Sequence, residues 1–134
     1  MLRKLIMSIF ELVEDQCKLI EEGRVLDVFE RYFHDDIMLI SNGEVFASSK
    51  TEGMRKQKEF FSSVSEMHPE LRKSLIKGDK VVLDFDYQFV MKSGEKVKFR
   101  GLHVQQWKGE KMLREEFFSG KNLEEELQNV AFYE

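Results

Sequence analysis

Two carboxylates stand two residues apart in the second half of the chain, a spacing that superficially resembles a paired acid and base. Asp84 and Asp86 lie in the segment 80–91, where apolar and polar residues alternate. Alternation with a period of two is typical of a strand with one buried face. The two aspartates share the face opposite Leu83 and Phe85. We therefore expect them on a solvated outer surface and not in an active site.

Residue types that bind metals or act as nucleophiles are few and scattered. His34, His68 and His103 have no ligand-like spacing, whereas zinc sites need clustered His and Cys ligands. Cys17 is the only cysteine and has acidic neighbours in the sequence, which raise the pKa of a thiol. We predict no metal site, no cofactor, and a Cys17 that fills space in the core or a pocket.

The composition is that of one ordinary globular domain covering residues 1–134. Lysine and arginine number 21 against 25 aspartates and glutamates, a net charge of −4, and 42% of residues are hydrophobic. A mildly acidic chain gives no reason to expect a nucleic-acid partner. The apolar run at 5–10 is too short to span a membrane. A lone cysteine favours a cytoplasmic location.

The first half of the chain predicts helices separated by one short strand. Apolar residues recur at helical spacing over 2–22 and again over about 25–33. The run at 37–40 is apolar and ends at Ser41-Asn42-Gly43, which indicates a buried strand entering a turn. A third helix is expected from Thr51 to about Met67.

The second half changes to strand periodicity. Tight-turn residues separate four strand-like segments, and a short helix follows; the predicted elements are strands 71–76, 80–91, 97–107 and 111–119 and a helix over 122–132. This order predicts an α+β fold in which a curved antiparallel sheet wraps around about three N-terminal helices. Such a cone has a cavity at its open end.

Two stretches resemble the SnoaL-like family of the nuclear transport factor 2-like superfamily. They are the run Phe33-His34-Asp35-Asp36-Ile37-Met38-Leu39 after two helices, and the hairpin over 107–118. The superfamily includes ketosteroid isomerase, limonene-epoxide hydrolase and scytalone dehydratase. The resemblance implies a cone-shaped, cystatin-like fold, and it is more specific for fold than for activity.

The ketosteroid isomerase residues do not carry over onto this chain. That enzyme uses an Asp base, with a Tyr and a neutral Asp as oxyanion hole. The resemblance places the base position at Ser41, the neutral Asp at Leu102, and the Tyr near Gln16 or Cys17. A serine hydroxyl is too weakly acidic to replace a carboxylate base. Isomerisation by that mechanism is therefore not expected.

Two of the limonene-epoxide hydrolase site residues have a counterpart in this chain. The resemblance places the hydrolase Arg at Arg100 and its second Asp at Glu115, while Leu102 replaces the first Asp. The water-positioning Tyr and Asn fall at Leu39 and Ser41. The candidate catalytic residues are thus Glu115 as base and Arg100 as the group that steadies negative charge. The alternative is a structural ion pair between them.

Strand parity taken from the resemblance divides the sheet into a pocket face and an outer face. The predicted ligand pocket consists of Leu39, Ser41, Phe85, Tyr87, Phe89, Arg100, Leu102, Leu113, Glu115 and Phe117. Tyr87 is either a pocket hydrogen-bond donor or a core tyrosine. The outer face is expected to carry Phe99, His103, Trp107 and Phe118. Such an apolar face, together with the resemblance, predicts a homodimer interface; the alternative is a few isolated exposed aromatic residues.

Three functions remain compatible with these residues. The first is binding of a small, largely apolar or aromatic molecule in the cone pocket. The second is a cofactor-free isomerase, lyase or hydrolase, polyketide cyclase-like or related to ketosteroid isomerase, with Glu115 as base. The third is a dimeric scaffold for protein interactions.

Overall fold

The computed structural model describes residues 7–129. Helices come first and strands dominate the second half, in the order α1 (Ile9–Glu21), α2 (Val25–Tyr32), β1 (Phe33–Ser41), β2 (Glu44–Ala47), α3 (Lys50–Phe61), β3 (Val64–Met67), β4 (Glu70–Lys77), β5 (Lys80–Met91), β6 (Lys96–Lys108), β7 (Lys111–Ser119) and α4 (Gly120–Asn129). No helix within the described range is long and apolar enough to cross a membrane.

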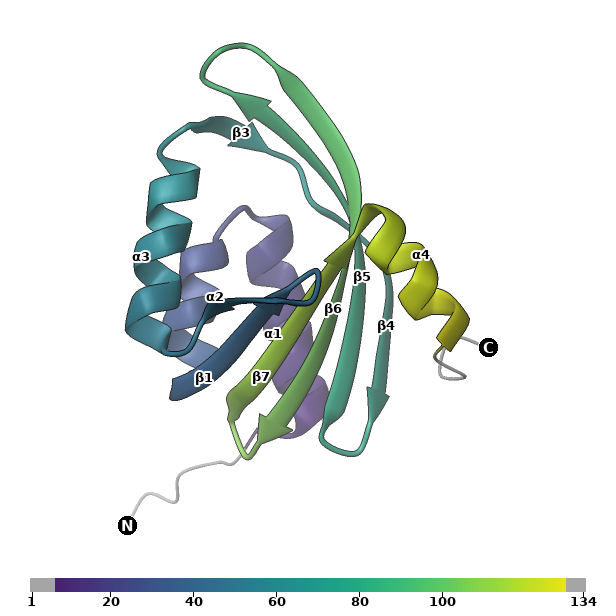
Figure 1. Ribbon diagram of the computed structural model, residues 1–134. Coiled ribbons are helices and arrows are strands. Elements are labelled where there is room, and N and C mark those ends of the chain that lie inside the picture. The colour runs from purple at the N-terminus through teal and green to yellow at the C-terminus, as the bar shows by residue number, and fades with distance from the viewer. Residues whose placement is uncertain (1–6, 130–134) are drawn as a thin grey trace.

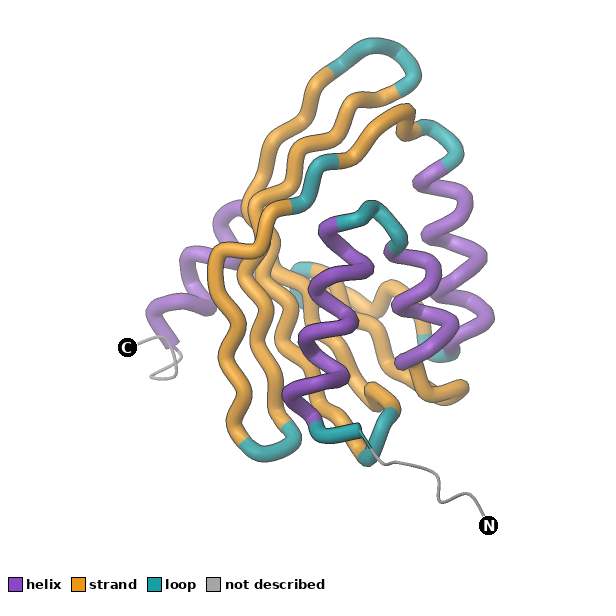
Figure 2. The backbone as a smooth tube through the Cα atoms, turned by 180° about the vertical axis from the view of Figure 1, so that it is seen from behind, coloured by secondary structure: helices purple, strands orange, loops and turns teal. Residues whose placement is uncertain are grey.

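The strands form one curved, unclosed sheet with helices on both sides. Strands β4 to β7 are consecutive antiparallel neighbours, which confirms the predicted meander. Strand β1 lies parallel to β7, and β3 shares the edge of β5 with β4. Helices α1 to α3 fill the concave side, while α4 lies on the convex side (Figures 1 and 2). The predicted α+β class is confirmed.

The predicted turn after β1 is a two-residue hairpin. Asn42 and Gly43 have φ angles of 49° and 84°, and the flanking Ser41 and Glu44 pair directly. Two successive positive φ values suit an Asn-Gly turn. The Asn42 side chain also bonds Ser119, accepting from its backbone N–H at 2.9 Å and donating to its hydroxyl at 3.0 Å. These bonds attach the hairpin to the end of β7.

The predicted third helix was too long. It ends at Phe61, and the residues after it form β3, because Val64 and Met67 pair with the edge of β5. The first helix begins at Ile9, with Ser8 as its N-cap. The predicted residues 2–6 of that helix, and 130–132 of the last one, lie outside the described residues.

The face assignment of β6 was also wrong. Phe99 and His103 line the concave side and Trp107 is in the main core. Leu102 and Val104 instead lie on the convex side with Leu123 of α4. Both faces of β6 are partly apolar because both are covered by helices, so alternation of hydrophobicity does not select the inward face.

Arg100 therefore lies outside the cone, and its partner is Asp84. The guanidinium donates to both carboxylate oxygens of Asp84, at 2.9 and 2.6 Å. Asp84 is 6% exposed, which corrects the expectation of a solvated aspartate. Asp86 is half-buried and pairs with Arg72 at 3.0 Å. The expected ion pair between Arg100 and Glu115 is not formed, because the two side chains are on opposite faces of the sheet.

Candidate functional site

A cavity of about 360 Å³ lies between helices α1 to α3 and the concave face of the sheet. Its lining is mainly aromatic and aliphatic, and comprises Gln16, Ile20, Val25, Val28, Phe29, Phe33, Leu39, Ile40, Ser41, Phe46, Gln57, Phe60, Phe61, Met67, Tyr87, Phe89, Phe99, His103, Glu115 and Phe117. Six of the predicted pocket residues are among them: Leu39, Ser41, Tyr87, Phe89, Glu115 and Phe117. An apolar cavity with few polar groups is the usual form of a small-molecule site.

The other four predicted pocket residues lie elsewhere. Arg100 and Leu102 are on the convex side of β6. Phe85 faces inward but is fully buried beneath the ring of Tyr87, with 5.6 Å between ring centroids. Leu113 stands where the register between β6 and β7 shifts, so Met112 takes the inward position beside Trp107.

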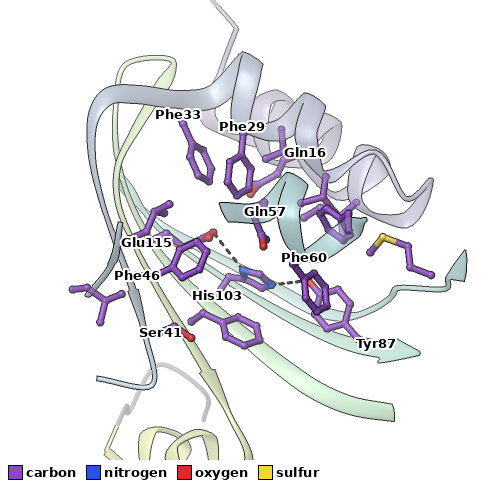
Figure 3. A pocket seen from close by; sticks show the side chains of 18 of the residues that line it. Gln16, Phe29, Phe33, Ser41, Phe46, Gln57, Phe60, Tyr87, His103 and Glu115 are labelled. Atoms are coloured by element: carbon purple, nitrogen blue, oxygen red, sulfur yellow. Dashed lines mark hydrogen bonds and ion pairs between the residues drawn. The ribbon is translucent and has the colours of Figure 1, made fainter. Parts of the chain in front are cut away.

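Three polar side chains form a row along the sheet wall of the cavity. The Tyr87 hydroxyl is 2.7 Å from Nε2 of His103. On the other side of the ring, Nδ1 of His103 is 3.4 Å from a carboxylate oxygen of Glu115. Figure 3 shows His103 between its two partners. The side chains of His103 and Glu115 are each 14% exposed, so the row is largely shielded from solvent.

His103 bonds one of its two neighbours in the row. Nδ1 is 3.4 Å from the Glu115 carboxylate but makes no hydrogen bond within residues 7–129. Nε2 and the Tyr87 hydroxyl share a hydrogen bond whose direction depends on the tautomer of the ring. Burial raises the pKa of Tyr87 well above its ordinary value, and the charge of Glu115 raises it further. Tyr87 is therefore a neutral phenol at physiological pH.

A buried amide network holds Glu115 in place. The Gln105 amide nitrogen donates to Glu115 at 2.7 Å and to Gln16 of α1 at 2.6 Å. The Gln105 oxygen accepts from the Trp107 indole at 3.0 Å. Gln16 and Gln105 are 1% and 0% exposed. Because buried polar groups are costly when unpaired, this network fixes the carboxylate in one position.

Gly101 makes room for the row. It lies in β6 between Phe99 and His103, and a Cβ there would be 2.8 Å from the Tyr87 ring and 2.6 Å from the Phe117 ring. Tyr87 pairs with Phe99 in the sheet register. Its hydroxyl reaches His103 because no side chain stands at Gly101. A glycine inside a strand often marks such a close approach.

The helical side of the cavity presents one further polar group. Gln57 of α3 points towards His103 from the opposite wall (Figure 3). No hydrogen bond is formed by its side-chain amide within residues 7–129. Ser41 lies at the sheet wall in the same view. Across residues 7–129, no three His, Cys, Asp or Glu side chains are grouped to hold a metal ion.

Sequence reasoning missed His103, Gln105, Gln16 and Gln57. His103 was expected on an outer dimer face together with Phe99 and Trp107, but all three face inward. Of the predicted contact residues only Phe118 is on the convex side, where it packs with the α4 cluster. Gly101 was the signal in the sequence for the inward face of β6. A glycine in the middle of a strand indicates that bulky side chains of neighbouring strands approach the backbone closely on that face.

Comparison with known proteins supports the fold. No family profile matches the chain, and no curated protein matches it. A proposed SnoaL-like polyketide cyclase from Mesorhizobium loti is similar at 24% identity and a TM-score of 0.71, over 83% of this chain and 98% of that one. An uncharacterised cystatin-fold protein from Novosphingobium aromaticivorans is similar at 20% identity and a TM-score of 0.71, over 83% and 97%.

A third similar structure contains a ligand. TerC, crystallised with polyporic acid, has 14% identity and a TM-score of 0.65, over 90% of this chain and 98% of that one. Identities this low establish shared architecture and leave activity open. The chain thus adopts the SnoaL-like, nuclear transport factor 2-like fold that residues 33–39 and 107–118 indicated.

Proposed function

We propose that the protein binds a small, largely apolar or aromatic molecule in the cavity between α1 to α3 and the sheet. The observation that carries the proposal is an apolar cavity of about 360 Å³ with a single polar row, Tyr87–His103–Glu115, on one wall. The apolar walls supply affinity through burial, and the polar row orients one end of the ligand. TerC provides a precedent for the fold, since it was crystallised with polyporic acid.

Displacement of a neutral fluorescent probe tests this proposal. N-phenyl-1-naphthylamine should bind the wild-type protein with an increase in fluorescence, because its rings enter the apolar cavity. Ser41→Phe should weaken binding at least tenfold, because a phenyl ring at that wall occupies ligand space. Ser74→Phe is the matched control, since Ser74 is exposed on β4 and away from the cavity. Equal binding by both variants would refute the cavity as the site.

A second candidate function is acid–base catalysis, as an isomerase, lyase or hydrolase. A tyrosine hydrogen-bonded to a histidine, with a carboxylate 3.4 Å from the far ring nitrogen, resembles a nucleophile or acid, a base and an orienting group. In this arrangement His103 exchanges the proton with Tyr87, and Glu115 holds the ring as a positioning residue. His103→Asn should then abolish turnover of a cavity ligand while probe binding persists. Unchanged turnover in that variant would exclude this function.

The cellular location stays a prediction. Cys17 is free and buried, as in proteins of reducing compartments, and we place the protein in the cytoplasm on that basis.

The sequence predicted a homodimer through four contact residues on the outer face of the sheet. Three of the four, Phe99, His103 and Trp107, lie on the concave side instead. Self-association therefore no longer follows from these residues.

A further inference from the structure

The cavity lining contains one charged side chain of fixed sign. Among the described residues that line it, Glu115 is the only Asp, Glu, Lys or Arg. Nδ1 of His103 faces that carboxylate at 3.4 Å but makes no hydrogen bond to it. Lys56 is not a lining residue, but its ammonium donates to the backbone oxygen of Phe46 at 2.6 Å and lies 5.3 Å from the centroid of that ring. Among the described lining residues, the cavity therefore offers one carboxylate in largely apolar surroundings.

One oxygen of Glu115 is available to a ligand. The amide of Gln105 and the ring of His103 both approach the same oxygen, Oε2. No protein donor reaches Oε1 within residues 7–129, although the side chain lines the cavity. A negative charge in a low-dielectric cavity strongly favours a positive partner over a neutral or negative one.

The remaining walls suit a cation that has few N–H groups. Nine of the 20 lining residues are aromatic, eight Phe and Tyr87. Aromatic faces attract organic cations, and sites of this kind recognise quaternary ammonium groups. A primary ammonium needs three acceptors around one nitrogen, whereas only six of the 20 lining residues are polar, and they are spread over helical and sheet walls: Gln16, Ser41, Gln57, Tyr87, His103 and Glu115. A protonated tertiary amine has one N–H group that needs an acceptor, and a quaternary ammonium has none.

We propose that the natural ligand of this cavity is a hydrophobic tertiary or quaternary amine, whose cationic nitrogen lies beside Glu115 and whose apolar body lies among the phenylalanines. This inference rests on the proposed binding function and specifies its ligand class. It assigns Glu115 the role of counter-ion to the ligand, while His103 and Gln105 keep the carboxylate oriented.

Two isosteric competitors separate the charge from the shape. Benzyltrimethylammonium and neopentylbenzene differ in having a charged nitrogen or a neutral carbon at the same position. Each is titrated against N-phenyl-1-naphthylamine bound to the wild-type protein, with phenylacetate as the anionic comparison. The cation should displace the probe at about tenfold lower concentration than neopentylbenzene, and phenylacetate should compete least.

Substitution of Glu115 tests whether its carboxylate causes the preference for the cation over neopentylbenzene. Glu115→Gln keeps the shape and a group that can bond Gln105, and it should remove the tenfold preference for the cation. Glu116→Gln is the matched control, because Glu116 pairs with Arg114 at 2.7 Å and is not a lining residue. That variant should keep the preference. Should Glu115→Gln fail to fold, the wild-type comparison of the two isosteres decides alone.

The outcomes distinguish this inference from the proposed function. If the naphthylamine probe binds but the cation competes no better than neopentylbenzene, the ligand class is wrong and cavity binding stands. A cation preference that survives in Glu115→Gln overturns the role of that carboxylate. If the probe does not enter the cavity at all, the proposed function fails first, and the inference fails with it.

Discussion

At the scale of single residues, the site depends on a position that has no side chain. Tyr87 and His103 are not direct neighbours in the register, since Tyr87 pairs with Phe99 and His103 with Leu83. The phenol reaches the imidazole by crossing Gly101. The contact between Tyr87 and His103 thus depends on the missing side chain at Gly101.

Gly101→Ala should destabilise the protein and disrupt the row. The new Cβ would meet the Tyr87 and Phe117 rings at 2.8 and 2.6 Å, and overpacking of this kind costs about 1–3 kcal/mol. Urea unfolding measures the loss, and probe binding reports on the cavity. Adding Phe117→Leu should restore part of the stability by removing the closer ring. An unchanged free energy of unfolding in Gly101→Ala would show that Tyr87 and Phe117 move freely.

At the scale of elements, α4 explains why β6 has two apolar faces. Leu123 of α4 is 4% exposed and packs on the convex side of the sheet with Leu102 and Val82. The opposite face of β6 holds the aromatic residues of the main core. Because both sides of one strand are buried, the strand loses the alternation that usually distinguishes its faces.

Leu123→Ala should lower stability without changing the cavity. Truncating a buried leucine costs about 2–5 kcal/mol, and α4 is on the convex side of the sheet, with no residue in the cavity lining. The free energy of unfolding should fall while the affinity of the retained fold for N-phenyl-1-naphthylamine stays the same. Glu124→Ala, an exposed change on the same helix, should alter stability by less than about 0.5 kcal/mol. Weaker probe binding in Leu123→Ala would contradict the separation of the two faces.

At the scale of the whole molecule, several ionisable groups are buried in their neutral forms. Burial raises the pKa of the Cys17 thiol to about 12, with a further contribution from Glu21. Burial and the hydrogen bond to Asp15 raise the pKa of Tyr32 to about 12. At a pH between their ordinary pKa values and about 12, these groups therefore stay protonated in the folded protein but ionise in the unfolded chain. Alkaline pH should consequently destabilise the fold as a unit.

Cys17→Ala tests this alkaline sensitivity. The unfolded thiol loses its proton above its ordinary pKa of 9.0, whereas the folded thiol keeps it to about 12. The unfolded state thus binds fewer protons in that window, and the free energy of unfolding falls as pH rises. Between pH 8 and 10.5 the wild type should lose about 2 kcal/mol more than Cys17→Ala, as measured by urea unfolding at both pH values. Equal losses in the two proteins would mean that the thiol ionises within the fold.

Local patterns predicted the α+β class and five of the seven strands, but not β2 or β3. Alternation over 80–91 gave β5 its correct bounds and faces, and the turn at Asn42-Gly43 was identified from residue types alone. These predictions succeeded because turn geometry and strand periodicity are properties of neighbouring residues. The third helix was extended too far because Val64 has helical spacing from Phe60 and Phe61, whereas pairing with β5 makes it a strand.

What the sequence determined by itself is the fold and the apolar character of the cavity, since both follow from hydrophobic periodicity and a heavy phenylalanine content. Only the tertiary structure decided which polar residues meet there. Arg100 and His103 are three residues apart in one strand, so a shift of parity by one position exchanges the inward set for the outward set. Leu102 packs with Leu123 of α4 on the convex face, and His103, one residue further along β6, therefore lies on the concave face between Tyr87 and Glu115.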